Sequence, residues 1–408
     1  MNLNKLPLVL AVAAAVAAPA ALAQSSVTVY GKLYPYIVNE DGSGATATTT
    51  PVATLAGARG PDAVTRNTAM VAGNSRFGIR GVEDLGGGLK AFFQMESVVA
   101  VNNGQGGGTA PQFWNRDTFV GLEKSGMGTL KLGLMDTIFK NYGDTIGILG
   151  ISSGTFMSTS NILRKPGFGT SNNARFHERL PNSIQFETAE FSGFQAGVQY
   201  SMQADKVPAR AEDTHATSLG LKYDNGPWYF AIAHETHKDF FGGSAQAPTA
   251  ARNTNTDLNR RSTDKATQFT VEYRLGKVHK FEFDVIQKEY KENPAATATG
   301  KFQSYKNTAF QLAMENRWTD QWRTAANYVR SNAGSCTLVA AACNTDGLDG
   351  TKFTLAVGYF FSRRTMAFAS VARLTNGKSA RFSTTEGPNA TNPGEDLTQM
   401  AVGLSHTF

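Results

Sequence analysis

Three short motifs in the sequence contain residue types that catalyse reactions or bind ligands. Residues 150–154 match the G-x-S-x-G pattern of a nucleophilic serine, and residues 377–379 end like a phosphate-binding loop. His234 and His237 are spaced almost as metal ligands are. A nucleophile elbow needs a strand before it and a helix after it, and a strand would turn the two histidines to opposite faces. Ala372 replaces the first glycine of the phosphate loop. The sequence therefore predicts no enzyme, no cofactor and no metal site.

The beginning of the sequence has the features of an export signal. Residues 1–23 contain one cation, Lys5, then the apolar residues 6–22 and an Ala-Leu-Ala cleavage pattern. We expect this signal peptide to be removed, leaving a single domain over residues 24–408; a retained membrane helix is the alternative. Its removal takes away one lysine and no acid, so the formal net charge falls from +6 to +5. This excess is small and dispersed, so we expect no nucleic-acid partner.

The two cysteines of the chain lie close together in the sequence. Cys336 and Cys343 have six residues between them, in a predicted long loop. An exported chain meets an oxidising compartment, where neighbouring cysteines form disulfides. No histidine lies near them in the sequence, so a catalytic cysteine site is not indicated. The sequence predicts a disulfide that fixes this loop.

Alternation of apolar and polar residues is the main structural signal. Residues 268–275, 281–285, 310–315 and 353–361 place apolar side chains at every second position. This is the period of a strand with two unlike faces, whereas an amphipathic helix repeats every 3.6 residues. Short turns such as residues 84–88 alternate with long polar connections. The whole domain is therefore predicted to consist of antiparallel strands.

Sixteen strands are predicted, with tight turns at one end and long loops at the other. They cover residues 26–38, 69–84, 89–101, 112–124, 128–137, 181–190, 193–203, 214–224, 227–237, 265–275, 279–291, 303–316, 321–331, 350–361, 364–374 and 396–408. An even number puts both chain ends on one side, which we expect to be periplasmic.

An open sheet of this width would leave two unpaired edges. Lipid cannot satisfy the backbone groups at such edges, so a membrane sheet must close into a barrel. A barrel of about 16 strands leaves a water-filled lumen, whereas eight strands pack shut. A secreted β-sandwich also alternates and is the competing fold. The fold class predicted here is all-β, a 16-stranded antiparallel transmembrane β-barrel.

Several longer stretches resemble one family. Residues 25–38 (SSVTVYGKLYPYIV), 74–97 (NSRFGIRGVEDLGGGLKAFFQMES), 113–133 (FWNRDTFVGLEKSGMGTLKLG), 180–188 and 400–408 are similar to the Gram-negative general porins of the β-proteobacterial type. The resemblance implies a channel in the cell outer membrane for passive diffusion of small hydrophilic solutes and ions. It also implies a homotrimer, with the third extracellular loop, here residues 138–180, folded inward as a constriction loop.

The resemblance further implies contacts outside the channel. The protein would touch outer-membrane lipid and lipopolysaccharide, and the barrel-assembly machinery would recognise its C-terminal strand. Phe408 resembles the family signal for barrel insertion. The chain departs from the family at Tyr34, where an Asp is common, and at Leu134, where an Arg is common. Both positions bear on the charge of the lumen.

Alternation assigns several charged side chains to the lumen. If Phe77 and Ile79 face lipid, then Arg76 and Arg80 face inward. The same reasoning on neighbouring strands places a second group inside, namely Glu96, Lys131 and Arg179. By resemblance, Arg76, Arg116 and Arg179 match the arginines that line the constriction. Arg116 is an even number of residues from Val120 and Leu122, so regular alternation would put it on their outward face. It can face the lumen only if a β-bulge intervenes or if the strand is already beyond the lipid band.

The predicted constriction loop contains Asp144 and Glu178. A loop carboxylate facing wall arginines would create a transverse field, and Asp144 is the residue chosen for that role. The positive wall predicts a mild anion preference, but no dense lysine cluster indicates a dedicated phosphate site. The alternatives are a substrate-selective channel for organic anions on the same barrel, and a barrel that acts through its loops as an adhesin or receptor.

Overall fold

The computed structural model describes residues 26–46, 53–57, 60–106, 113–143, 145–169, 174–202, 213–253, 260–294, 298–387 and 389–408. The predicted signal peptide lies outside the described residues.

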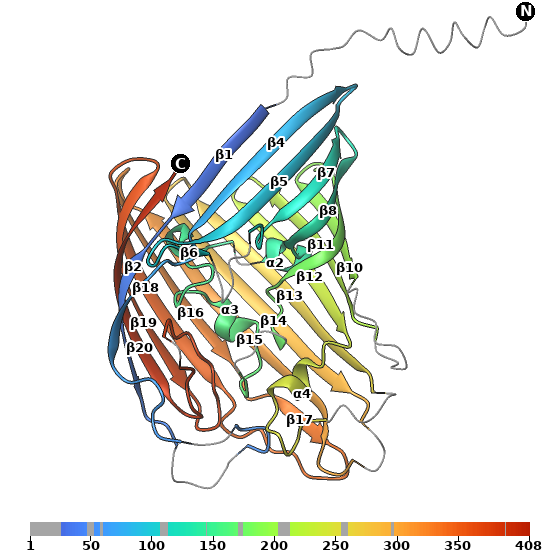
Figure 1. Ribbon diagram of the computed structural model, residues 1–408, viewed down its shortest axis with the longest axis vertical. Coiled ribbons are helices and arrows are strands. Elements are labelled where there is room, and N and C mark those ends of the chain that lie inside the picture. Colours follow the sequence, from blue (N-terminus) through green and yellow to red (C-terminus); the bar gives the residue numbers. More distant parts are fainter. Residues whose placement is uncertain are drawn as a thin grey trace, which may run out of the picture.

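One antiparallel sheet forms the molecule and closes on itself (Figure 1). Its strands are β1 (Ser26–Leu33), β2 (Tyr36–Ser43), β3 (Asn67–Val71), β4 (Arg76–Gly86), β5 (Leu89–Ala100), β6 (Gln105–Gly106), β7 (Thr118–Lys124), β8 (Gly128–Asp136), β9 (Arg179–Thr188), β10 (Phe194–Met202), β11 (His215–Asn225), β12 (Trp228–Lys238), β13 (Ser262–Leu275), β14 (His279–Glu292), β15 (Phe302–Arg317), β16 (Trp322–Ser331), β17 (Ser335–Leu338), β18 (Gly350–Phe360), β19 (Thr365–Asn376) and β20 (Asp396–Thr407).

The structure has twenty labelled strands, whereas sixteen were predicted. Two interruptions within long strands and two short additional strands account for this difference. β1 and β2 continue one another across residues 34–35, and β3 and β4 do so across residues 72–75. β6 and β17 are short additions at the loop end. The described residues thus form a closed barrel of sixteen strands, which confirms the predicted fold class.

The first and last strands join the two edges of the sheet. β20 pairs with β1 through Lys32 opposite Thr407, and it continues along β2. The backbones of Gly31 and Phe408 exchange two hydrogen bonds, at 3.1 and 3.0 Å. The two edges of the sheet are therefore joined, although residues 26–30 of β1 pair with β4 alone. Closure gives the backbone groups along the seam partners that lipid cannot supply.

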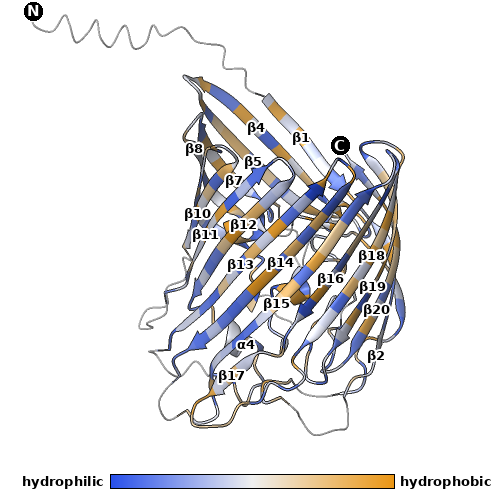
Figure 2. Cartoon of the chain, turned by 180° about the vertical axis from the view of Figure 1, so that it is seen from behind, coloured by the Kyte–Doolittle hydropathy of each residue, from blue (hydrophilic) through white to orange (hydrophobic). Residues whose placement is uncertain are grey.

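The two faces of the sheet differ as the alternation predicts. On β13 the outward Phe269 is 42% exposed, whereas its neighbours Gln268 and Thr270 are each 1% exposed. Figure 2 shows the resulting alternation of orange and blue along the strands seen from outside. The barrel is apolar where it meets lipid and polar where it faces its lumen.

The two ends of the barrel also differ. Tight turns join the strands at one end, as at Gly226 and Gly276, whose φ angles of +59° and +62° favour glycine. In Figure 1 the start of β1 and the C-terminus lie at this same end. The described helices are short and lie in the long connections: α2 (Ile138–Tyr142), η2 (Ile148–Gly150), α3 (Ser160–Leu163) and α4 (Gly242–Gln246). No helix in the described part of the chain has the length and apolar character needed to cross a membrane.

Two predicted strand bounds are wrong. The first strand continues to Ser43 instead of ending at residue 38. β7 begins at Thr118 instead of residue 112. Just before it, the Arg116 N–H still donates to the carbonyl of Glu96 on β5, at 3.0 Å, but regular pairing has not begun. Asn115 accepts the backbone N–H of Val98 with its side-chain oxygen, at 3.0 Å. A side-chain acceptor thus replaces a strand partner at this position.

We predict that Gly31→Val prevents stable closure. A Cβ at this position would lie 2.7 Å from the carbonyl oxygen of Arg76 and would overlap the Phe408 ring. Overpacking of this kind costs about 1–3 kcal/mol. The folded, heat-modifiable band after refolding into detergent should decrease sharply. Gly147→Ala is the control, since the nearest atom would be 3.6 Å away. Equal yields of the two variants would show that the seam tolerates a side chain.

Candidate functional site in the barrel lumen

The connection between β8 and β9 runs inside the barrel. Its helices contact opposite parts of the wall: α2 packs on β11 and β12, α3 on β15 and β16, and η2 on β16 and β18. Figure 1 shows α2 and α3 within the ring of strands. We name residues 137–178 the lumen loop. It crosses the interior, so its side chains and those of the facing wall determine what space remains for solutes.

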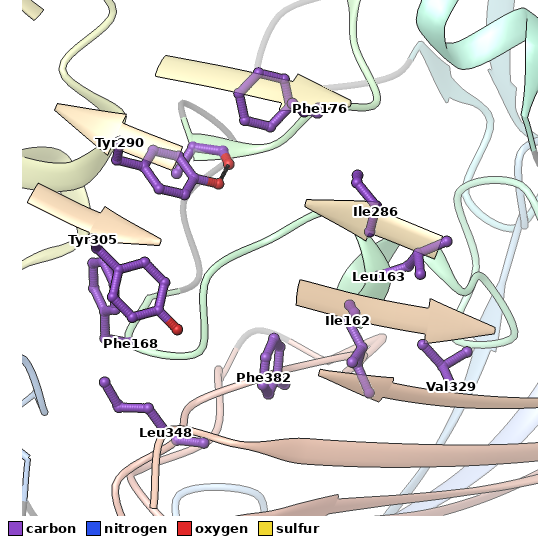
Figure 3. Packing of buried hydrophobic residues seen from close by; sticks show 14 of the residues in the cluster. Ile162, Leu163, Phe168, Phe176, Ile286, Tyr290, Tyr305, Val329, Leu348 and Phe382 are labelled. Atoms are coloured by element: carbon purple, nitrogen blue, oxygen red, sulfur yellow. Dashed lines mark hydrogen bonds between the residues drawn. The ribbon is translucent and has the colours of Figure 1, made fainter. Parts of the chain in front are cut away.

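Apolar packing holds part of the lumen loop against the wall. Figure 3 shows Ile162 and Leu163 of α3 among Ile286 of β14 and Val329 of β16. Phe168 packs edge-on against Tyr305, with ring centroids 4.8 Å apart. Burying a large apolar side chain stabilises a structure by about 1.5–3 kcal/mol. This cluster therefore fixes the middle of the lumen loop to one side of the barrel.

Cations and hydroxyl groups of the wall donate hydrogen bonds to carbonyl groups of the lumen loop. Lys288 Nζ donates to the carbonyl of Leu163 at 2.6 Å, and Lys352 Nζ donates to that of Ser158 at 2.7 Å. Tyr290 donates its hydroxyl to the carbonyl of Ala174 at 2.6 Å. An irregular segment inside a protein needs such partners, because no neighbouring strand bonds its backbone N–H and C=O groups.

Carboxylates of the wall accept from the same loop. Glu282 accepts the backbone N–H of Thr145 at 3.1 Å and that of Ile146. The Thr145 hydroxyl lies within hydrogen-bond distance of Glu272, at 2.7 Å, and of Glu282, at 2.8 Å. Charge-assisted hydrogen bonds are roughly twice as strong as neutral ones. The lumen loop is thus held by both donors and acceptors.

A polar cavity of about 490 Å³ remains between the wall, the lumen loop and the connection of residues 377–395. Its cationic and imidazole side chains are Arg116, Lys140, Lys165, Arg175, His177 and Arg179. Glu386 is the carboxylic acid in the lining, and most of the remaining lining residues carry hydroxyl or amide groups. The cavity is therefore polar, with more cationic than anionic side chains.

The wall arginines of this region are paired with acids. Arg179 lies 2.8 Å from Asp117 and 2.8 Å from Asp136. Glu96 forms ion pairs with Arg116 and, at 3.6 Å, with Arg76. Arg116 precedes β7, so the parity of that strand does not govern its direction, and its side chain lines the cavity. These pairs orient the guanidinium groups and offset part of their charge.

None of the other predicted site residues that the structure describes lines this cavity. The guanidinium of Arg80 lies 5.1 Å from the ring centroid of Tyr30, and Lys131 forms an ion pair with Glu187 at 3.1 Å. Arg76 and Glu96 are adjacent to the cavity through Arg116 but do not line it. Asp144 lies outside the described residues.

The lumen loop presents three cations to the cavity, residues that the sequence places in the predicted constriction loop without giving them a direction. Lys140, Lys165 and Arg175 come together there with the wall arginines. The described loop acid Glu178 pairs with Arg175 of the same loop, at 2.6 Å. Strand alternation cannot tell which way a loop side chain points. This grouping therefore has no local signal in the sequence. Lys288 and Lys352 were also missed, although the alternation of their strands places them inward.

Burial shifts the pKa values of several loop groups. Burial, followed by repulsion from Arg175, lowers the pKa of Lys165 to about 8. Burial, together with repulsion from Lys140 and other cations, lowers the pKa of His177 well below its usual value. Burial raises the pKa of Glu386 to about 7, although that carboxyl accepts hydrogen bonds from the Tyr36 hydroxyl and the Phe156 N–H. The charge of the cavity therefore depends on pH near neutrality.

The predicted disulfide is present. Cys336 of β17 is bonded to Cys343, with a Cα–Cα distance of 5.7 Å. Both half-cystines pack on the apolar cluster that includes Phe302 and Tyr305. The bond confirms the prediction and closes the hairpin of residues 336–343, whose strand β17 pairs with β15.

A closed barrel with an apolar exterior and a charged, loop-filled lumen defines the class of outer-membrane channels. The chain matches the model of the Gram-negative porin family over residues 10–379, and it belongs to that family. Family and fold place it in the outer membrane.

The similar proteins support the same assignment. An outer membrane porin protein of Bordetella pertussis is 33% identical over 175 residues, covering 40% of this chain and 42% of the relative. The chain thus matches about two fifths of the length of its curated relatives. An anion-selective porin from Comamonas acidovorans has the same fold, with a TM-score of 0.68, 21% identity, and coverage of 94% of this chain and 100% of that one. A trimer form of OmpT from Vibrio cholerae also matches the fold, with a TM-score of 0.61, 15% identity, and coverage of 94% and 99%.

We predict that Lys352→Met loosens the lumen loop. The substitution keeps a long side chain but removes the donor to the carbonyls of Phe156 and Ser158. A lost hydrogen bond from a charged group costs about 1.5–3 kcal/mol, so amides of residues 155–163 should exchange hydrogen at least about tenfold faster. Exchange measured by mass spectrometry on the folded barrel tests this. Lys378→Met, at an exposed loop position, is the control, and equal exchange in both variants would contradict the anchoring role.

Proposed function

We propose that the protein forms a water-filled channel for passive diffusion of small hydrophilic solutes and ions, with a mild preference for anions. The observation that carries this proposal is the polar cavity between the lumen loop and the wall, where five Lys and Arg side chains meet one carboxylic acid. We name this cavity the constriction. Arg76, Arg80, Lys131, Glu96 and Glu178 contribute to the field around it.

These fixed charges affect passing ions because the constriction is narrow. In bulk solution at physiological salt, a charge is screened over about 8 Å. Inside a constriction a solute passes within that distance of the lining, so fixed charges discriminate between anions and cations. Preference is mild because Arg116, Arg179, Lys140 and Arg175 each have an acidic partner. The net positive charge around the constriction is therefore small.

Family membership supports the remaining parts of the proposal. The protein assembles as a homotrimer in the outer membrane, in contact with lipid and lipopolysaccharide. The barrel-assembly machinery inserts it by recognising β20 and Phe408. It has no catalytic activity of its own. A substrate-selective channel for organic anions would differ by showing saturable block of ion current by its solute.

We predict that replacing Arg76, Arg116 and Arg179 by Ser shifts selectivity toward cations. The substitutions remove three positive charges and leave Glu96, Asp117 and Asp136 without these partners, so the field at the constriction becomes less positive. The zero-current potential across a planar bilayer in a salt gradient measures the shift. Arg317→Ser, at an exposed turn position, is the control. An unchanged potential in a conducting triple variant would remove these arginines from the selective region.

We predict that anion preference falls as the pH rises from about 6 to about 9. Below its pKa of about 7, Glu386 is neutral, and above it the carboxylate adds negative charge to the constriction. Lys165 loses its positive charge around its pKa of about 8, so both groups act in the same direction. Burial is the main cause of the raised pKa of Glu386; Tyr36 and Lys352 oppose the rise, and Glu40 adds to it.

Two variants separate the contributions to this pH profile. Glu386→Gln keeps an acceptor for the Phe156 N–H and removes the earlier part of the change. Lys165→Gln removes the later part. The zero-current potential, recorded at several pH values, is the measurement. A profile that is the same in the wild-type protein and in both variants would refute the assignment.

A further inference from the structure

Residues 344–349 connect the disulfide hairpin to β18, and their buried part packs against the lumen loop. The segment begins directly after Cys343 and ends at the start of β18. Leu348 within it is fully buried in the apolar cluster that holds the lumen loop. Figure 3 shows Leu348 in this cluster together with Phe382 and Phe168. We name residues 344–349 the brace, because three other segments of the chain contact it.

The first of these segments is the lumen loop, which the brace meets without intervening space. A Cβ at Gly167 would overlap the carbonyl oxygen of Leu348, so only a glycine permits this approach. The next residue, Phe168, packs on Tyr305 of β15, with ring centroids 4.8 Å apart. These two loop residues are therefore enclosed between the wall and the brace. Lys165, which lines the constriction, is only two residues before Gly167.

The brace also holds two other connections between strands. The backbone N–H of Thr54 donates to the carbonyl of Asn344 at 2.8 Å, and the Asn344 N–H donates to the Thr54 hydroxyl at 2.9 Å. The N–H of Ser379 donates to the carbonyl of Gly347 at 2.9 Å. Ser379 belongs to the connection of residues 377–395, which lines part of the constriction. The brace is therefore a common support for three segments that are far apart in the sequence.

The disulfide fixes the start of the brace. Cys336 lies on β17, where it is paired with Tyr305 of β15. The bond to Cys343 therefore holds the chain, one residue before the brace, close to the strand whose Tyr305 ring packs on the lumen loop. The Thr345 hydroxyl closes the same hairpin with a hydrogen bond to the carbonyl of Gly334, at 2.8 Å. A covalent link of this kind removes open arrangements that the segment would otherwise sample.

We propose that the disulfide-fixed brace sets the size limit of the channel by holding the lumen loop at Gly167 and Phe168. This inference rests on the proposed function, since a size limit exists only if solutes pass. The brace does not line the constriction, so its residues are positioning residues that act through the lumen loop. When the brace moves, residues 164–169 lose a support, and Lys165 is free to withdraw from the cavity. The constriction then becomes wider.

The first measurement is hydrogen exchange, read by mass spectrometry, on the folded protein in detergent before and after reduction of the disulfide by a water-soluble phosphine. Thiol titration establishes that two thiols form per chain. We expect amides of residues 164–169 and of the brace to exchange at least about tenfold faster after reduction, because the disulfide no longer restricts the open arrangements. Amides of β13 and β14, which are paired along the barrel wall, should exchange as before.

The second measurement compares the entry of a monosaccharide and of a trisaccharide into liposomes that contain the protein. Reduction should raise the trisaccharide rate relative to the monosaccharide rate, and reoxidation should restore the original ratio. The double variant Cys336→Ser and Cys343→Ser should behave as the reduced protein. It should not respond to the phosphine, which makes it the matched control for the reagent. If this variant does not fold, reduction of the folded wild-type protein still decides the question.

Two results would overturn the proposal. One is unchanged exchange of residues 164–169 in protein whose two thiols have been titrated. The other is faster exchange with an unchanged ratio of the sugar rates, because the brace would then have no influence on the constriction. A wild-type protein that admits neither sugar and carries no ion current would instead contradict the proposed function. The exchange measurement does not depend on conduction, so it would still report whether the brace holds the lumen loop.

Discussion

The requirement that every backbone polar group find a partner in lipid governs this structure. A strand in a membrane can satisfy this requirement only if it has neighbours on both sides, so the sheet must close. Closure depends on β20 meeting β1 and β2, and Gly31 makes the seam possible because it leaves room for Phe408. Once the sheet is closed, the period of two divides every strand into a lipid side and a lumen side. The apolar exterior and the polar interior are therefore consequences of one backbone constraint.

The polar interior in turn makes the lumen loop possible. An irregular segment inside an apolar barrel would leave its carbonyl and N–H groups unsatisfied. Here Lys288 and Lys352 donate to loop carbonyls, and Glu282 accepts from loop amides. These wall charges are occupied in holding the loop. The cations that line the constriction come largely from other places: the loop itself, and the ends of the strands where it leaves and re-enters the wall.

The sequence predicted the barrel well because its signal is local. Alternation is readable within six or seven residues, and it gave the strands, their faces and the fold class. It was wrong at the start of β7, where the side chain of Asn115 replaces a backbone partner, an effect that composition does not reveal. The grouping of Lys165, Arg175 and Glu386 could not be predicted. More than 200 positions separate Glu386 from the other two, and their proximity depends on the paths of two irregular segments. The inward direction of Lys288 and Lys352, by contrast, was readable from parity.

The net charge of the chain is a poor guide to selectivity for the same geometric reason. Many of its basic residues act in one of three places: as anchors of the lumen loop, in the lining of the constriction, or on the outward face of the barrel. The wall keeps the second and third groups on opposite faces, and salt screens exposed charges over about 8 Å. Lys265 and Lys306 thus add to the formal charge of the chain while contributing little to the field that a solute meets inside. Selectivity must follow the balance at the constriction, where ionisation of the single acid Glu386 changes the local sum by one unit while the overall composition stays the same.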